Sequence, residues 1–160
     1  MALKVGDKAP DFTLPSFTPS KDLTQISLGS LKGKNVVLLF FPQAFTGVCT
    51  TEMCTMNENF DDYKGMNAEV LGISVDGTFV QKGFADVNKI TIPLLSDFNK
   101  EVVKSYDVLR PEFVHGMKGT SERAVFAVDK EGVIRYVEVT ENPGVQIHFD
   151  GLKKAVTGLK

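Results

Sequence analysis

The sequence predicts an α/β fold, in which helices flank a mixed β-sheet, and three observations support this prediction. Residues 36–41 (VVLLFF) are six apolar residues in a row, which is typical of a strand buried on both faces. Strand and helix patterns then alternate along the chain. Finally, RAVFAVD at 123–129 and VIRYVEV at 133–139 flank a short turn, which predicts an antiparallel hairpin in the same sheet.

The segments around the central strand follow from local patterns. Residues 1–20 are rich in turn-forming residues and predict at most short edge strands or a hairpin. Residues 27–35 predict a short helical turn and a loop that leads into the central strand. After that strand, apolar residues recur at spacings of three and four from Cys49 to Phe60. This period predicts a helix, and Gly65 is placed to end it.

Shorter elements are predicted in the second half of the chain. They are a strand at 69–75, a helix at 79–87, a strand at 92–95, a helix at 101–108 and a last helix at 152–159. Asp76 and Asp150 are candidate N-caps for the first and last of these helices. Residues 110–120 contain one proline and two glycines, so we predict a surface loop there.

Length, composition and charge limit the possible classes of protein. A chain of 160 residues predicts one domain, residues 1–160, with a core that needs no disulfides. The formal net charge of −2 provides no basic surface for nucleic acid or an acidic membrane. No run of 18 apolar residues and no secretory signal is visible, so we expect a soluble, cytoplasmic protein. In that reducing compartment, the two cysteines are expected to be reactive rather than structural.

Cys49 follows the central strand and lies near the start of the predicted helix, where open α/β sheets place their chemistry. A free thiol has a pKa near 8.5, so only about 3% is thiolate at pH 7. A dominant thiolate needs roughly 3 kcal/mol of stabilisation, whereas a helix N-terminus supplies ~0.3–1 kcal/mol and at most ~2 kcal/mol. A buried cation is therefore expected. Arg123, at the start of a core strand, is the candidate.

Two residues of the preceding loop complete a motif. Thr46 can direct its hydroxyl at the Cys49 sulfur or at a substrate oxygen, and Pro42 can shield a thiolate from water. Pro42, Thr46 and Cys49 form a P-x-x-x-T-x-x-C pattern that resembles the active-site motif of peroxiredoxins, and Arg123 lies where that family keeps an arginine. Nearly the whole chain shares the resemblance, in the segments 5–16, 31–42, 70–76 and 124–136.

This resemblance implies a thioredoxin-like (peroxiredoxin) fold and a thiol peroxidase that reduces hydrogen peroxide and organic hydroperoxides without a cofactor. Cys49 would be the peroxidatic cysteine, whose thiolate attacks the peroxide and becomes a sulfenic acid. Thr46 and Arg123 would hold the peroxide oxygens and stabilise charge on the departing one. Glu52 matches a glutamate that orients the arginine in many relatives.

Cys54 indicates a branch of the family. Its spacing of five from Cys49 resembles the bacterioferritin-comigratory (PrxQ) branch, in which the second cysteine resolves the sulfenic acid as an intramolecular disulfide. Residues five apart in a helix lie about 140° around and ~7.5 Å along the axis, whereas a disulfide requires Cα atoms within roughly 7 Å. The helix would therefore have to unwind. The segments 44–49 and 110–116 equally resemble the one-cysteine AhpE branch.

The resemblance also implies partners. Thioredoxin or a glutaredoxin-like protein is the expected reductant. Relatives in these branches are monomers or dimers formed by loops around the active site, so we expect a monomer or a homodimer. Phe45, Phe79 and Phe113 are candidate contact residues for a dimer.

Other interpretations of the same residues stay open. A non-enzymatic redox sensor or holdase could use the same thiol, because a sensor and a peroxidase share the attacking step. Cys54 could be an inert residue on the inner face of the helix, and Glu52 could simply favour the helix N-terminus. A Cys2His2 metal site is disfavoured because His115 and His148 are 33 residues apart and no zinc knuckle is present. A dithiol oxidoreductase is disfavoured because no CxxC motif occurs.

Overall fold

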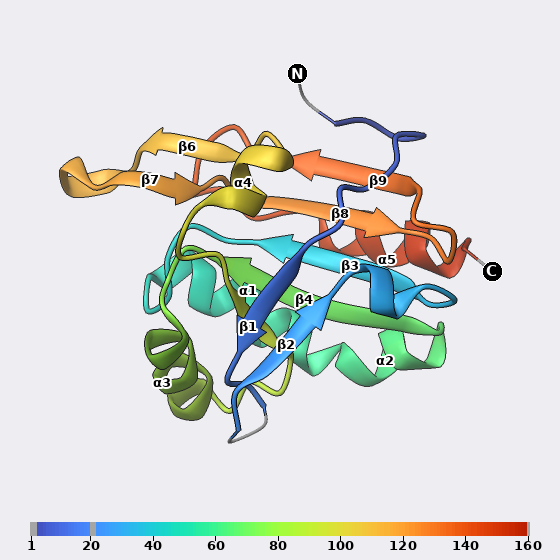
Figure 1. Ribbon diagram of the computed structural model, residues 1–160, viewed down its shortest axis with the longest axis horizontal. Helices are drawn as coiled ribbons and strands as arrows, with labels where there is room; N and C mark the ends of the chain where they lie inside the picture. Colours follow the sequence, from blue (N-terminus) through green and yellow to red (C-terminus); the bar gives the residue numbers. More distant parts are fainter. Residues whose placement is uncertain (1–2, 20–21, 160) are drawn as a thin grey trace.

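A seven-stranded sheet lies at the centre of the computed structural model, which describes residues 3–19 and 22–159. The strand order is β2-β1-β5-β4-β3-β8-β9, and helices cover both faces (Figure 1). β3 (Asn35–Phe40) pairs in parallel with β4 (Ala68–Ser74) and antiparallel with β8 (Ala124–Val128). The sheet is therefore mixed, and the predicted fold class is confirmed.

The other strands of this sheet are short and lie toward its edges. They are β1 (Thr13–Ser16), β2 (Thr24–Ser27), β5 (Leu94–Ser96) and β9 (Ile134–Val139). The helices connect the strands or follow the last one. They are η1 (Gly29–Leu31), α1 (Gly47–Glu58), α2 (Phe60–Gly65), α3 (Thr78–Asn88), α4 (Glu101–Ser105), η2 (Val114–Gly116) and α5 (Phe149–Thr157).

The side chains of β3 alternate between two apolar clusters, one on each face of the sheet. Leu39 belongs to the cluster that contains Met53 of α1, together with residues of α2, α3 and α5. Leu38 belongs to the cluster that contains Val103 of α4. Because successive side chains of a strand point to opposite faces, an uninterrupted apolar run is needed to fill both clusters. This packing fixes the carboxyl end of β3, from which the loop to α1 starts.

The helix predicted from Cys49 to Gly65 is two helices in the structure. α1 begins at Gly47, so Cys49 lies in its first turn, and α1 ends at Glu58. Asn59 has φ −97° and ψ 7°, and α2 continues from Phe60 to Gly65. The apolar period continues across the break because α1 and α2 both pack on the same face of the sheet. The period alone therefore could not reveal the break.

Residues 110–120 form a hairpin, so the prediction of a loop there was wrong. β6 (Leu109–Glu112) and β7 (Lys118–Ser121) pair antiparallel in a separate two-stranded sheet. The connection between them uses left-handed backbone at His115 (φ 59°) and Gly116 (φ 74°). Most side chains of this hairpin are exposed or partly exposed, so it lacks the alternating apolar pattern that identifies a half-buried strand.

Both predicted N-caps were also wrong. Gly77 is the N-cap of α3, and the Asp76 carboxylate instead accepts a hydrogen bond from the backbone of the β3–α1 loop. His148 is the N-cap of α5, so Asp150 lies inside the first turn. The helix predicted at 101–108 is shorter, since α4 ends at Ser105.

The remaining predictions agree with the structure. β8 and β9 form the predicted antiparallel hairpin, with an irregularity in the pairing between Ala127 and Val128. β1 and β2 form a short antiparallel pair at the other edge of the sheet. Residues 1, 2 and 20 of the predicted turn-rich segment lie outside the described residues.

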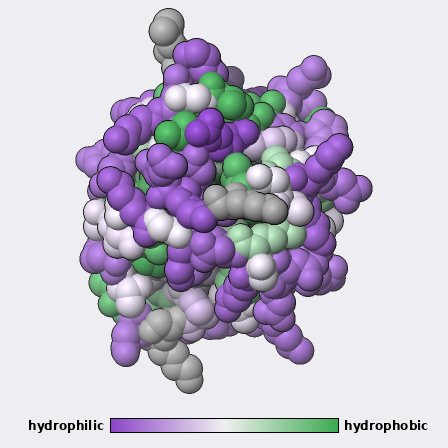
Figure 2. Space-filling view, turned by 90° about the vertical axis from the view of Figure 1, so that its right-hand side faces the viewer, coloured by the Kyte–Doolittle hydropathy of each residue, from purple (hydrophilic) through white to green (hydrophobic). Residues whose placement is uncertain are grey.

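Figure 2 views the end opposite the start of α1 and shows a surface of mainly hydrophilic side chains with small apolar areas. No helix in residues 3–19 and 22–159 combines the length and apolar character that crossing a bilayer requires.

Packing around Gly72 in β4 gives the first prediction. A Cβ atom there would lie 2.7 Å from Leu94 Cδ2, 3.4 Å from Phe41 Cε1 and 3.5 Å from Met53 Sδ. We expect Gly72→Val to lower the free energy of unfolding by about 3 kcal/mol, because overpacking a dense core typically costs ~1–3 kcal/mol. Urea unfolding measures the change.

Gly65→Ala is the matched control, because a Cβ built there meets no atom within 4 Å beyond its chain neighbours and the backbone of its own helix. It should leave the free energy of unfolding within about 1 kcal/mol of the wild-type value. Equal losses of unfolding free energy in Gly72→Val and Gly65→Ala would contradict the packing argument.

Candidate active site

The loop between β3 and α1 places Cys49 inside the protein at the carboxyl end of the sheet. Pro42 is buried two residues after the end of β3, and Cys49 has no exposed surface. The Ala44 N–H donates to Asp76 Oδ2 at 2.8 Å, and the Ser74 hydroxyl donates to the same oxygen at 2.7 Å. Burial raises the pKa of Asp76, while these hydrogen bonds oppose the shift. The Asp76 carboxylate thus attaches the loop to the end of β4.

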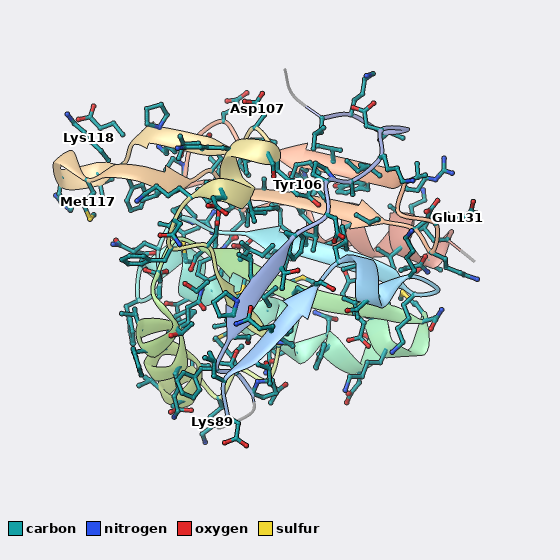
Figure 3. All side chains as sticks on the ribbon, viewed as in Figure 1. Lys89, Tyr106, Asp107, Met117, Lys118 and Glu131 are labelled. Atoms are coloured by element: carbon teal, nitrogen blue, oxygen red, sulfur yellow. The ribbon has the colours of Figure 1, made fainter. Side chains whose placement is uncertain are left out.

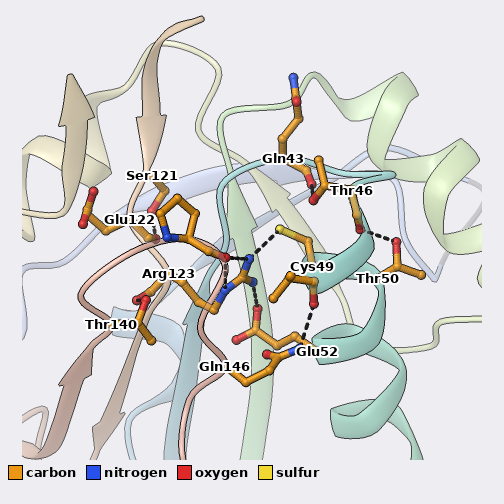
Figure 4. Close-up of polar contacts among 12 residues, drawn as sticks. Gln43, Thr46, Cys49, Thr50, Glu52, Ser121, Glu122, Arg123, Thr140 and Gln146 are labelled. Carbon is orange, nitrogen blue, oxygen red and sulfur yellow. Dashed lines mark hydrogen bonds and ion pairs between the residues drawn. The ribbon is translucent and has the colours of Figure 1, made fainter. Parts of the chain in front are cut away.

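Arg123 lies immediately before β8 and contacts the Cys49 sulfur (Figure 4). Its Nη2 donates to Cys49 Sγ at 3.2 Å, and its Nη1 donates to Glu52 Oε1 at 2.7 Å. Nη2 and Nε also donate to the Pro143 carbonyl, at 2.7 and 3.2 Å. Arg123 is 2% exposed. The structure therefore brings together the cation and the thiol that the sequence analysis paired.

Glu52 lies beside Cys49 on the inner face of α1 and is fully buried. Burial is the largest influence on its pKa and raises it to about 7, while Arg123 opposes the shift and Glu138 adds to it. Within the described residues, Glu52 Oε2 has no hydrogen-bond partner. One carboxylate oxygen is thus bonded to the guanidinium and the other is enclosed without a partner.

Thr46 lies beside the site, and its hydroxyl, predicted to reach the sulfur or a substrate oxygen, does not donate to the sulfur. Oγ1 donates to the Gln43 carbonyl at 2.8 Å (Figure 4). The Thr46 carbonyl accepts from the Thr50 N–H at 2.9 Å and from the Thr50 hydroxyl at 2.7 Å. The hydroxyl oxygen keeps its capacity to accept a hydrogen bond from a bound molecule.

Sequence reasoning missed two residues between β9 and α5. The Pro143 carbonyl accepts from Arg123, and Gln146 Nε2 donates to the Val48 carbonyl in the first turn of α1 at 2.9 Å. The only sequence signal was the Pro-Gly pair at 143–144, which indicates a turn but not what the turn contacts. Residues 140–148, the β9–α5 connection, therefore form one wall of the site.

Cys54 lies on the same continuous helix as Cys49. Both cysteines are free, Cys49 buried and Cys54 partly buried. In an ordinary helix, this spacing keeps the two side chains apart, so the observed state is one that cannot form the disulfide without rearrangement.

The histidines lie elsewhere. The Nδ1 atom of His148 is 2.7 Å from Glu138 Oε2, and His115 is exposed in η2. Across residues 3–19 and 22–159, no group of three or more histidine, cysteine or acidic side chains could hold a metal ion.

The β3–α1 loop carries an exposed aromatic side chain that packs against α3. Phe45 is 55% exposed, has a left-handed backbone (φ 67°) and packs against Phe84, with ring centroids 5.3 Å apart. Phe79 is 78% exposed, whereas Phe113, a third candidate contact residue, is 9% exposed. The β6–β7 hairpin contacts the same loop, because Met117 Sδ accepts from Gln43 Nε2 at 3.5 Å. Figure 3 shows Met117 on this hairpin and Glu131 at the opposite end of the molecule.

Comparison with known proteins identifies the family. The model of the AhpC/TSA family matches residues 5–137, which include all the site residues up to Arg123. The chain belongs to this family of peroxiredoxins. It is therefore a peroxidase enzyme that takes a hydroperoxide as substrate and a thiol as reductant.

Two relatives of this peroxiredoxin match most of its length. It is 36% identical to the chloroplastic 2-cysteine peroxiredoxin of Chattonella marina var. antiqua over 146 residues, which cover 87% of this chain and 72% of the relative. It is 32% identical to peroxiredoxin-1 of Gallus gallus over 146 residues, which cover 87% and 71%.

Solved structures share the fold. Peroxidoxin BcpB of Mycobacterium tuberculosis aligns with a TM-score of 0.83 at 29% identity and covers 99% of each chain. The reduced 2-Cys peroxiredoxin of Plasmodium vivax aligns with a TM-score of 0.84 at 27% identity and covers 96% of this chain and 80% of that chain. The thioredoxin-like peroxiredoxin fold is confirmed.

Burial of Glu52 in this peroxiredoxin predicts a pH-dependent stability. Its pKa in the folded state, about 7, lies above the ordinary value of 4.5, so the folded form binds more protons between these values. The free energy of unfolding then falls as pH rises through this window. Glu52→Gln removes this contribution. The free energy of unfolding of the wild type minus that of the variant should fall by about 1–3 kcal/mol between roughly pH 4 and pH 8.

Urea unfolding of both proteins across this pH range measures the difference. A difference that stays constant or rises with pH would mean that Arg123 keeps Glu52 ionised throughout.

Proposed function

We propose that Cys49 is the peroxidatic cysteine of this peroxiredoxin and that Arg123 activates it. The observation that carries the proposal is the 3.2 Å contact between Arg123 Nη2 and Cys49 Sγ in a fully buried site. A guanidinium at this distance favours the thiolate over the thiol, and removal of water strengthens the attraction. The start of α1 adds the positive end of a helix dipole beside the same sulfur.

The reaction follows from these charges. The Cys49 thiolate attacks the terminal oxygen of the hydroperoxide, an S–O bond forms and the O–O bond breaks. The sulfur is oxidised to a sulfenic acid, and the departing alkoxide or hydroxide takes a proton from solvent to leave as alcohol or water. Arg123 and the Thr46 hydroxyl hold the peroxide oxygens while negative charge moves from sulfur to oxygen. Pro42 limits the access of water.

The backbone of α1 contributes further donors. Thr50 donates the first hydrogen bond of the helix, to Thr46, so the N–H groups of residues 47–49 have no acceptor within it. These N–H groups belong to the helical turn that carries Cys49 and can stabilise the departing oxygen without moving.

Glu52 acts in this proposal by positioning Arg123. Its Oε1 atom fixes Nη1 at 2.7 Å, and the Pro143 carbonyl fixes the opposite side of the guanidinium. The planar group then presents Nη2 to the sulfur in one orientation. A lysine could not make these contacts at the same time.

We further propose that Cys54 resolves the sulfenic acid, as in the PrxQ branch. The Cys54 thiol attacks the Cys49 sulfur, a disulfide forms and water leaves. Two electrons and two protons from thioredoxin or a glutaredoxin-like protein then restore both thiols. The partly buried position of Cys54, about 1.4 turns beyond Cys49 on α1, supports this role once the first turn unwinds.

A second copy of the chain is the other proposed partner. Phe45 in the active-site loop and Phe79 in the first turn of α3 are exposed, and burial of such aromatic side chains favours association. This surface supports a homodimer in which each site lies near the contact.

Replacement of Arg123 tests its role. Arg123→Lys keeps the charge but loses the fork of donors, so we expect the second-order rate constant for hydrogen peroxide to fall by about 10²–10³-fold. Stopped-flow measurement of Cys49 oxidation gives this rate. Arg135→Lys is the control, because Arg135 is half-exposed and pairs with Asp129 on the surface. If both variants react at the wild-type rate, Arg123 has no part in the chemistry.

Mass spectrometry under non-reducing conditions tests Cys54. After one equivalent of hydrogen peroxide, the wild type should lose two hydrogens as the disulfide forms. Cys54→Ser should instead gain one oxygen, located on Cys49, because no second thiol can attack. A gain of oxygen on Cys49 in both proteins would make Cys54 a bystander and assign one-cysteine chemistry with an external thiol.

A further inference from the structure

The β9–α5 connection contacts both Arg123 and α1, the helix that carries Cys49. Its Pro143 carbonyl accepts two hydrogen bonds from Arg123, and its Gln146 side chain donates to the Val48 carbonyl. Figure 4 shows Arg123 and Gln146 near Cys49 and Glu52. One short segment near the end of the chain thus holds both the arginine and the helix that carries the thiol.

The Val48 carbonyl is directly linked to the motion of Cys49. It belongs to the peptide group that also contains the Cys49 N–H, and a peptide group moves as a rigid plane. Any movement that brings Cys49 toward Cys54 must therefore displace this oxygen. The 2.9 Å bond from Gln146 Nε2 opposes that displacement.

The placement of Gln146 is itself unusual. Its Oε1 atom is buried and has no partner among residues 3–19 and 22–159, whereas Nε2 makes the bond to Val48. Buried amide oxygens normally find a donor. Within the described residues, the Gln146 amide therefore keeps its hydrogen bond to α1 through Nε2, while its buried Oε1 atom has no donor.

The connection is anchored independently of α1. The His148 N–H donates to Glu138 at 3.0 and 3.1 Å, and the Tyr136 hydroxyl donates to the same carboxylate at 2.9 Å. The Gly144 N–H donates to Asn142 Oδ1 at 2.9 Å. The His148–Glu138 bonds tie the carboxyl end of the connection to β9, and its amino end follows directly from β9. Gln146 therefore holds α1 from a segment fixed at both ends.

We propose that Gln146 is a positioning residue that sets how readily the first turn of α1 opens, and thereby how sulfenic Cys49 divides between two fates. In the open helix, the Cys54 thiol attacks the Cys49 sulfur, the disulfide forms and water leaves. In the closed helix, a second hydroperoxide oxidises the sulfenate to a sulfinic acid and leaves as alcohol or water. This inference rests on the proposed resolving role of Cys54.

Gln146→Leu tests the proposal, because leucine fills a similar volume without a donor. We expect two changes, each roughly 2- to 12-fold, the range that follows from a typical net hydrogen-bond contribution. The N–H groups of residues 50–53, whose helical acceptors are the carbonyls of residues 46–49, should exchange faster with deuterium in the reduced protein. The ratio of disulfide to sulfinic acid after graded peroxide should rise.

Gln25→Leu is the matched control, since Gln25 is exposed on the edge strand β2, and it should leave both measurements at wild-type values. The urea midpoint of each variant verifies that the fold is intact, and Gln146→Ala replaces Gln146→Leu if leucine lowers that midpoint.

The outcomes distinguish the positioning role of Gln146 from the resolving role of Cys54 on which it rests. Wild-type exchange and a wild-type product ratio in the Gln146 variant overturn the positioning role. Faster exchange with sulfinic acid as the sole product in both wild type and variant supports the hold of Gln146 on the helix and overturns resolution by Cys54. Faster exchange with more disulfide supports both.

Discussion

The buried guanidinium of Arg123 is the constraint on which the site depends. A charge removed from water is costly unless hydrogen bonds and an opposite charge surround it. Here the partners come from two places far apart in the sequence, Cys49 and Glu52 on α1 and Pro143 on the β9–α5 connection. Because Cys49 and Glu52 are three residues apart, they share one face of α1 and meet the same guanidinium. The contacts that stabilise the Arg123 charge thus fix α1, the β9–α5 connection and the start of β8 relative to each other.

The sequence was informative where patterns are strong or where chemistry needs particular residues. The apolar run of β3 and the β8–β9 hairpin were predictable because burial imposes their composition. The pairing of Cys49 with Arg123 was predictable because a thiolate needs more stabilisation than a helix provides, and because the motif around Cys49 resembles that of peroxiredoxins. Glu52 followed from the same resemblance, and the structure places it against Arg123.

Other features leave little trace in the sequence. The contact of Pro143 uses a backbone carbonyl, which every residue possesses, so no residue type marks it. Gln146 reaches α1 across 98 positions, and a single glutamine carries no periodic signal. Most side chains of the β6–β7 hairpin are exposed or partly exposed, so it lacks the alternating apolar pattern. The rotamer of Thr46 depends on the nearby Gln43 carbonyl, which offers its hydroxyl a partner that residue order does not indicate.

The location of both cysteines on one helix also has a consequence for recognition. In the reduced protein, α1 is continuous and its first turn is fastened from outside. Under the proposed cycle, the disulfide can exist only when that turn has unwound, so the oxidised protein displays a contour that the reduced protein lacks. A reductant that fits this contour binds the oxidised protein and releases the reduced protein, because reduction restores the helix. Reduced enzyme molecules therefore do not occupy the reductant.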